Sequence, residues 1–102
     1  MDSWQPITAP ELEAIVARQL CACSPEQQAV FASCRVPFYP VPLSRLGAIE
    51  SALVVAELPT GLLYFEDVEE GFEIGTPGPD GVLPDQGCNQ LELAHVLTRA
   101  GL

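Results

Sequence analysis

The fold is decided by residues 52–72, which read ALVVAELPTGLLYFEDVEEGF. Two apolar runs, residues 52–58 and 62–68, are separated by the three residues Pro59-Thr60-Gly61, and a second three-residue connection, Glu69-Glu70-Gly71, precedes Phe72. Such loops suit a type I turn closed by a glycine in the left-handed region, which gives a bulged hairpin. We therefore predict a three-stranded antiparallel meander over residues 52–58, 62–68 and 72–76.

Capping signatures predict two helices upstream of the meander and one downstream. Thr8 with Glu11, and Ser24 with Gln27, each fit a capping box, in which a hydroxyl and an N3 side chain satisfy each other's backbone amides. Asn89, followed by Glu92, predicts the cap of the last helix. Apolar residues at helical spacing mark the buried faces of the first and last helices: Leu12, Ile15, Val16 and Leu20, then Leu93, Val96, Leu97 and Ala100.

The segments between these elements are extended or turns. Prolines at 37, 40 and 42 remove ladder donors, so residues 36–42 are expected to form an edge strand or a covering strap. Residues 43–51 fit either a helix or a strand, and Gly47 with the β-branched pair after it favours the strand. Pro79-Asp80-Gly81 predicts a chain reversal before a short strand at Val82-Leu83. The order predicts one α+β domain over residues 1–102, with helices on one face of the sheet and possible edge strands.

Composition narrows the function classes. Four arginines and 14 acidic residues give a net charge of −10, and there is no lysine. A lysine-free chain cannot form a lysine Schiff base or a P-loop, and a strongly acidic surface repels nucleic acid. No apolar run approaches the ~20 residues of a membrane span, and residues 1–6 lack the basic and apolar regions of a secretory signal, so we expect a cytoplasmic protein that binds neither membrane nor nucleic acid. The apolar fraction of 48% leaves surface for a second copy of the chain.

The positions of the cysteines and the single histidine give little support for a catalytic site. In a reducing cytosol Cys21, Cys23, Cys34 and Cys88 are expected to be buried thiols without metal or disulfide. Cys88 precedes a predicted helix start, which lowers a thiol pKa. His95 lies about 10 Å further along the axis, which is too far to activate Cys88. We expect Glu92, His95 and Arg99 to form a solvated polar stripe, and we assign no catalytic, cofactor or metal residue.

Acidic side chains dominate the second half. Ten lie between residues 46 and 98 with no arginine among them, and five fall within residues 66–73. A solvated loop would explain them; a surface for a basic partner would also explain them, because crowded carboxylates gain from a nearby cation. Strand alternation places Leu63 and Phe65 on one face and Tyr64 on the other, among the acids. The predicted partner-binding residues are Tyr64, Glu66, Asp67, Glu69, Glu70 and Glu73.

A resemblance agrees with this interpretation. Residues 54–57 and 63–72, with Gly87-Cys88-Asn89-Gln90 opening the last helix, resemble small acidic bacterial proteins of uncharacterised function, and more loosely the immunity proteins that neutralise toxins. The likeness covers the C-terminal half, carries no active site, and implies a non-enzymatic binder. The preferred hypothesis is therefore an acidic protein-binding module, in its sharpest form an immunity-type inhibitor of a basic partner. The alternatives are a structural or regulatory homo-oligomer and a small thiol- or metal-dependent enzyme.

Overall fold

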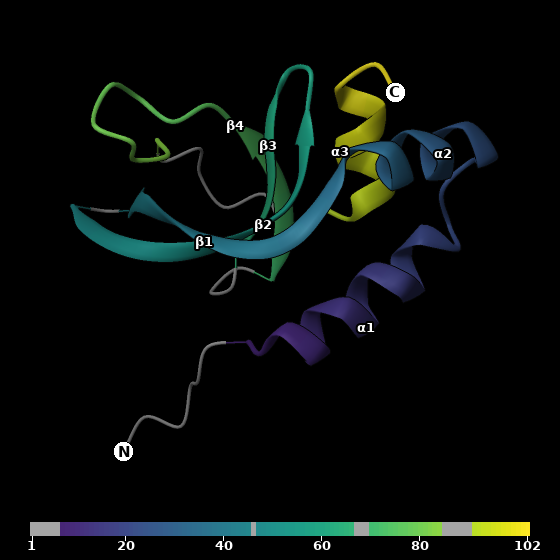
Figure 1. Cartoon of the computed structure of the whole chain (residues 1–102), viewed down its shortest axis with the longest axis horizontal. Helices are drawn as coiled ribbons and strands as arrows, with labels where there is room; N and C mark the ends of the chain where they lie inside the picture. The colour runs from purple at the N-terminus through teal and green to yellow at the C-terminus, as the bar shows by residue number, and fades with distance from the viewer. Residues whose placement is uncertain (1–6, 46, 67–69, 85–90) are drawn as a thin grey trace.

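The computed structural model describes residues 7–45, 47–66, 70–84 and 91–102 (Figure 1). Two helices, α1 (Ala9–Leu20) and α2 (Pro25–Cys34), precede four antiparallel strands in the order β1-β2-β3-β4, and a short helix α3 (Leu93–Arg99) follows. The strands are β1 (Arg35–Arg45), β2 (Ala48–Leu58), β3 (Gly61–Glu66) and β4 (Gly71–Gly75). The predicted α+β fold is confirmed, and the meander is extended by the edge strand β1.

Both predicted capping boxes start their helices. The Thr8 hydroxyl accepts a hydrogen bond from the Glu11 amide, and the Glu11 carboxylate accepts one from the Thr8 amide. Ser24 and Gln27 make the same reciprocal pair at the start of α2. Each box satisfies backbone donors that a helix start leaves without intrahelical partners, so α1 and α2 begin where the sequence predicts.

The prolines of β1 lie where a backbone amide is not needed. The Leu83 amide donates to the Pro42 carbonyl and the Ser44 amide donates to the Leu83 carbonyl, so residues 42 and 44 face away from β2. By alternation Pro40 faces outward too, and a proline there removes no bond to β2. Within the ambiguous segment 43–51, residues 43–45 lie in β1 and residues 48–51 lie in β2, so the favoured strand is confirmed there. Gly47 lies in the turn between the two strands, and Leu46 lies outside the described residues. The expected strand at residues 82–83 is a single bridge between Leu83 and Leu43.

The prediction of two three-residue loops ending in glycine was wrong. Gly61 pairs with Leu58 as the first residue of β3, which leaves the two-residue turn Pro59-Thr60. In the next connection Glu70 has the positive φ, +55°, and Gly71 already pairs with Glu66. Gly61 serves a different purpose from the predicted one, because its φ is +146° and a Cβ there would lie 2.9 Å from the Gly75 carbonyl oxygen.

The sheet buries both of its faces. The main core lies between the sheet and all three helices, and Phe65 and Phe72 meet edge to face within it with ring centroids 5.1 Å apart. A second, smaller cluster fills the opposite face, where Leu83 of the loop after β4 packs on the strands. The helices therefore cover one face, as expected, but the other face is not open to solvent along its length. The second cluster consists of Val41, Leu43, Ala52, Val54, Tyr64 and Leu83.

Helix α3 is held at both ends by glutamines of the other helices. It begins at Leu93, later than the predicted cap at Asn89, which lies outside the described residues. Its start has no side-chain cap of its own, and instead the Gln19 side-chain oxygen accepts the Leu93 amide at 2.7 Å. At the other end the Gln27 amide group donates to the Thr98 hydroxyl and the Leu102 carbonyl. The Gln19 bond replaces the side-chain cap that the start of α3 lacks. The end of α3 has its own cap, in which the Gly101 and Leu102 amides donate to the Thr98 and Leu97 carbonyls, and the Gln27 bonds tie α2 to this end.

Candidate functional site

The predicted acidic residues Glu66 and Glu73 do not share one site, because each forms an ion pair with a different arginine. Glu66, near the end of β3, pairs with the Arg45 guanidinium, and the two side chains are 12% and 9% exposed. Glu50 lies 3.7 Å from the same arginine and is more exposed. The carboxylate of Glu66 is therefore neutralised within the fold, and little of it is left for a partner to contact.

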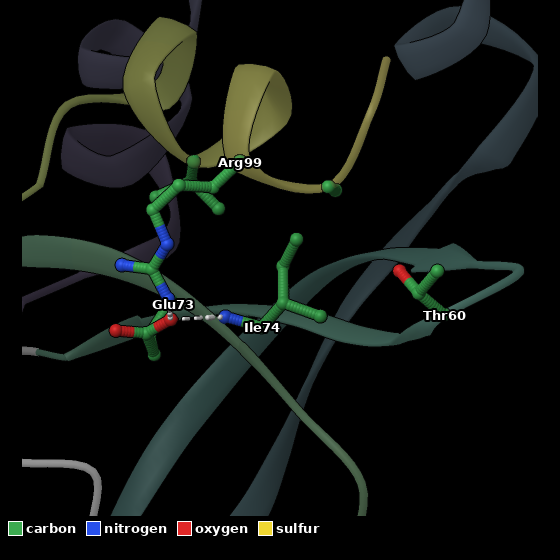
Figure 2. Close-up of a pocket in the computed structure, with 6 residues that line it drawn as sticks. Thr60, Glu73, Ile74 and Arg99 are labelled. Carbon is green, nitrogen blue, oxygen red and sulfur yellow. Dashed lines mark hydrogen bonds and ion pairs between the residues drawn. The ribbon is translucent and has the colours of Figure 1, made fainter.

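Glu73 is likewise used internally. Its side chain is 8% exposed, and its Oε2 lies 3.1 Å from Nη2 of Arg99 on α3. The same oxygen accepts the Ile74 backbone amide at 3.1 Å (Figure 2). Burying a carboxylate is costly unless it is paired and hydrogen-bonded, and both conditions are met here. The pair thus ties α3 to the outer edge of β4.

A small hollow of about 270 Å³ adjoins this ion pair. Figure 2 shows Glu73 and Arg99 pointing toward each other on one side, with Thr60 on the other side and Ile74 between them. The remaining lining, from Val96 and Ala100, is apolar. The hollow offers one hydroxyl and a charge-balanced pair, which is a sparse set of polar groups for orienting a ligand.

Tyr64 is not the exposed anchor that strand alternation predicted. The alternation itself is confirmed, since Leu63 and Phe65 face the helices and Tyr64 faces the opposite side. That side is covered, however, and Tyr64 is only 1% exposed because it is part of the second cluster. Of the other predicted residues Glu70 is exposed, whereas Asp67 and Glu69 lie outside the described residues.

The exposed charge of the described part is strongly negative. Three of the four arginines form internal ion pairs: Arg35 with Glu13, Arg45 with Glu66 and Arg99 with Glu73. Arg18 is the one arginine with no ion pair to another described residue. Within the same ranges several exposed acidic side chains form no ion pair: Glu26, Glu57, Glu70, Asp80 and Glu92.

One of these acids is held in a fixed place by a tyrosine. The Tyr39 hydroxyl on β1 donates a 2.8 Å hydrogen bond to Oε2 of Glu57 on β2. Burial raises the pKa of Tyr39, and the neighbouring Glu57 carboxylate raises it further. Sequence reasoning missed this pair because the contact is diagonal and follows a register shift in β1 between Arg35 and Tyr39. No periodicity in the sequence marks such a shift.

The thiols and the histidine do not come together in the described residues. Cys23 is buried, as expected, and burial raises its pKa, but Cys21 is exposed and Cys34 is partly buried. The expectation of buried thiols was therefore wrong for Cys21, the exposed residue that follows the end of α1, and only partly met for Cys34. Glu92, His95 and Arg99 are all exposed, as predicted, but Arg99 also forms an ion pair with the buried Glu73 and is not simply a solvated side chain. Cys88 lies outside the described residues, and within them no three metal-ligating side chains form a group.

Comparisons with known proteins do not assign the chain to a family. No family model matches the chain, and no curated protein or solved structure is significantly similar to it. The resemblance to small acidic bacterial proteins and immunity proteins stays a prediction. In the described part of the chain, no helix has both the length and the apolar character to cross a membrane.

Proposed function

We propose that the chain is a non-enzymatic protein-binding module that recognises a basic partner in the cytoplasm. The most specific version of this proposal is an immunity-type inhibitor of a cationic toxin. The observation that carries the proposal is the imbalance at the surface. Three of four arginines are paired internally, whereas exposed carboxylates such as Glu26, Glu70 and Glu92 have no ion pair within the described ranges. A partner therefore meets a negative field, which accelerates encounter with a cationic surface by about 10- to 10³-fold.

Recognition would involve side chains and not the addition of a strand. The outer edge of β1 carries Pro40 and Pro42 and is bridged by Leu83. On the outer edge of β4, the Phe72 amide donates to the Leu91 carbonyl and the Ile74 amide donates to the Glu73 carboxylate. Sheet edges protected in this way resist pairing with another strand. A partner would therefore bind a face of the molecule.

Self-association is the alternative with one observation in its favour. Ile49, next to the β1–β2 turn, is a large apolar side chain that is 64% exposed. A net charge of −10 on each copy opposes such contact, and the opposition weakens in salt. Light scattering at micromolar concentration distinguishes the two, because a homo-oligomer has a mass above that of one chain.

Affinity capture with charge variants tests the proposal. The protein is immobilised as the wild type, as the triple variant Glu26→Gln, Glu70→Gln and Glu92→Gln, and as the charge-preserving control with aspartate at the same positions. We expect a basic protein to be retained by the wild type and by the aspartate control, to be retained less by the glutamine variant, and to be released by moderate salt. Retention that is equal on all three, or a partner that is itself acidic, would contradict the proposal.

A further inference from the structure

The hydrogen-bonded pair Tyr39 and Glu57 lies at the border of the second cluster, on the face of the sheet opposite the helices. The Tyr39 ring is partly buried while Glu57 is exposed, so the ring supports a carboxylate that faces solvent. Two apolar side chains, Val36 and Leu62, are also partly buried against the same cluster. Leu62 is the cross-strand neighbour of Glu57 in the β2–β3 register. The exposed Glu57 carboxylate therefore lies beside an aromatic ring and an aliphatic side chain on the border of this cluster.

This carboxylate is positioned before any partner arrives. Its Oε2 accepts the Tyr39 hydroxyl, which restricts the rotamers of a glutamate that would otherwise be mobile. Both residues stand on paired strands and not on a loop, so the backbone fixes their separation. Binding to a group that is already ordered avoids part of the entropy cost that exposed ion pairs incur. Glu57 therefore differs from Glu26, which is exposed and has no such restraint in the described structure.

The chain itself shows which cation suits such a surface. Arg35 lies over the Phe31 ring, with its Cζ 5.2 Å from the ring centroid, and the same guanidinium binds Glu13 at 2.9 Å. A planar guanidinium can stack on an aromatic face and fork onto a carboxylate at the same time, which the ammonium of lysine cannot do. Tyr39 and Glu57 provide the same combination of an aromatic ring and a carboxylate. No arginine among the described residues occupies it, since Glu57 has no ion pair to a described residue.

We infer that Tyr39 and Glu57 form the docking point for an arginine side chain of the partner protein. The guanidinium would stack on the Tyr39 ring and bind the Glu57 carboxylate, while Val36 and Leu62 contact the aliphatic stem. The tyrosine hydrogen bond leaves lone pairs on both carboxylate oxygens, so a forked contact is still available. This inference rests on the proposed function, because it names the part of the acidic surface that a basic partner contacts. It replaces the buried Tyr64 as the aromatic anchor.

Titration with small peptides, followed by amide NMR shifts of the full chain, tests the inference. The probes are acetyl-Gly-Arg-Gly amide and the matched peptides with lysine or citrulline in the central position. Citrulline has nearly the shape of arginine without its charge. We expect the arginine peptide to shift the amides of Tyr39, Glu57 and Leu62 most, the lysine peptide to bind more weakly, and the citrulline peptide to leave them unchanged.

Four variants, including one charge control, locate the contact. Glu57→Gln is expected to weaken the arginine peptide by at least about fivefold, whereas the control Glu70→Gln, which removes the same charge elsewhere, changes it by less than about twofold. Tyr39→Phe keeps the ring and is expected to reduce binding less than Tyr39→Ala. Superimposable spectra without peptide verify that each variant is folded.

Two results would overturn the inference: shifts spread evenly over the acidic surface, or equal effects of Glu57→Gln and Glu70→Gln. Either result leaves the proposed function standing if a basic protein is still captured in a salt-sensitive manner. Failure of the capture experiment, by contrast, removes the proposed function even where the arginine peptide binds at Tyr39.

Discussion

Replacing Gly61 by alanine tests the geometry of the turn between β2 and β3. Gly61 has a φ of +146°, and an added Cβ would lie 2.9 Å from the Gly75 carbonyl oxygen and 3.2 Å from the Thr76 hydroxyl. The dihedral alone costs an L-residue about 1–3 kcal/mol. The steric contact adds on the order of 1 kcal/mol or more, because the closest atom belongs to a backbone that must shift. Gly61→Ala is therefore expected to lower the free energy of unfolding by about 2–4 kcal/mol.

Gly47→Ala is the matched control for this substitution. Gly47 also has a positive φ, +82°, but a Cβ there meets nothing within 4 Å. Its cost is limited to the dihedral, about 1–2 kcal/mol. Urea denaturation followed by far-UV circular dichroism measures both variants on the same scale. Equal losses for the two, or a Gly61→Ala variant as stable as the wild type, would show that the close approach to Gly75 does not constrain this turn.

Two further predictions concern side chains with defined partners. Gln27→Ala removes hydrogen bonds to the Thr98 hydroxyl, the Leu102 carbonyl and the Ser24 amide, and we expect a loss of about 2 kcal/mol by urea denaturation. The control is Glu26→Ala, an exposed position on the same helix, for which we expect a loss of less than about 1 kcal/mol. Equal losses of unfolding free energy for the two variants would argue against a structural role for the Gln27 hydrogen bonds. The pKa of Tyr39 is raised in the folded state, so the folded chain binds this proton more tightly than the unfolded chain does. The stability that results is fully present below the unfolded pKa of about 10 and is lost as the pH rises through the folded pKa. Tyr39→Phe is expected to flatten the alkaline decline in stability, and an unchanged decline would contradict the shift.

The local parts of the fold could be predicted from the sequence. Capping boxes at Thr8 and Ser24 depend on residues three apart, and the amphipathic spacing after them identifies buried Leu12 and Val16 correctly. Strand alternation likewise separates Leu63 from Tyr64. These patterns act over one or two turns or strands, so a single sequence contains all the information that they need.

The candidate site depended on contacts between distant residues. Alternation shows that Tyr64 faces away from the helices, but the burial of this face depends on a cluster that includes Leu83, which lies 19 residues further along the chain and forms a bridge with Leu43. In the same way Glu73 belongs to an acidic run in the sequence, and Arg99, 26 residues later, neutralises it in the fold. Charge runs therefore overstate the charge that a surface presents, because ion pairs across the fold have no local signature.

The ionic-strength dependence of association tests the central claim most directly. The rate constant for binding of the captured partner is measured by stopped flow from about 20 mM to about 200 mM sodium chloride, across which the screening length falls from roughly 20 Å to below 10 Å. If exposed carboxylates attract a basic surface, the association rate falls by about tenfold or more while the dissociation rate changes little. A rate that stays constant across this range would contradict the claim that the negative surface of this chain serves to recognise a cationic protein.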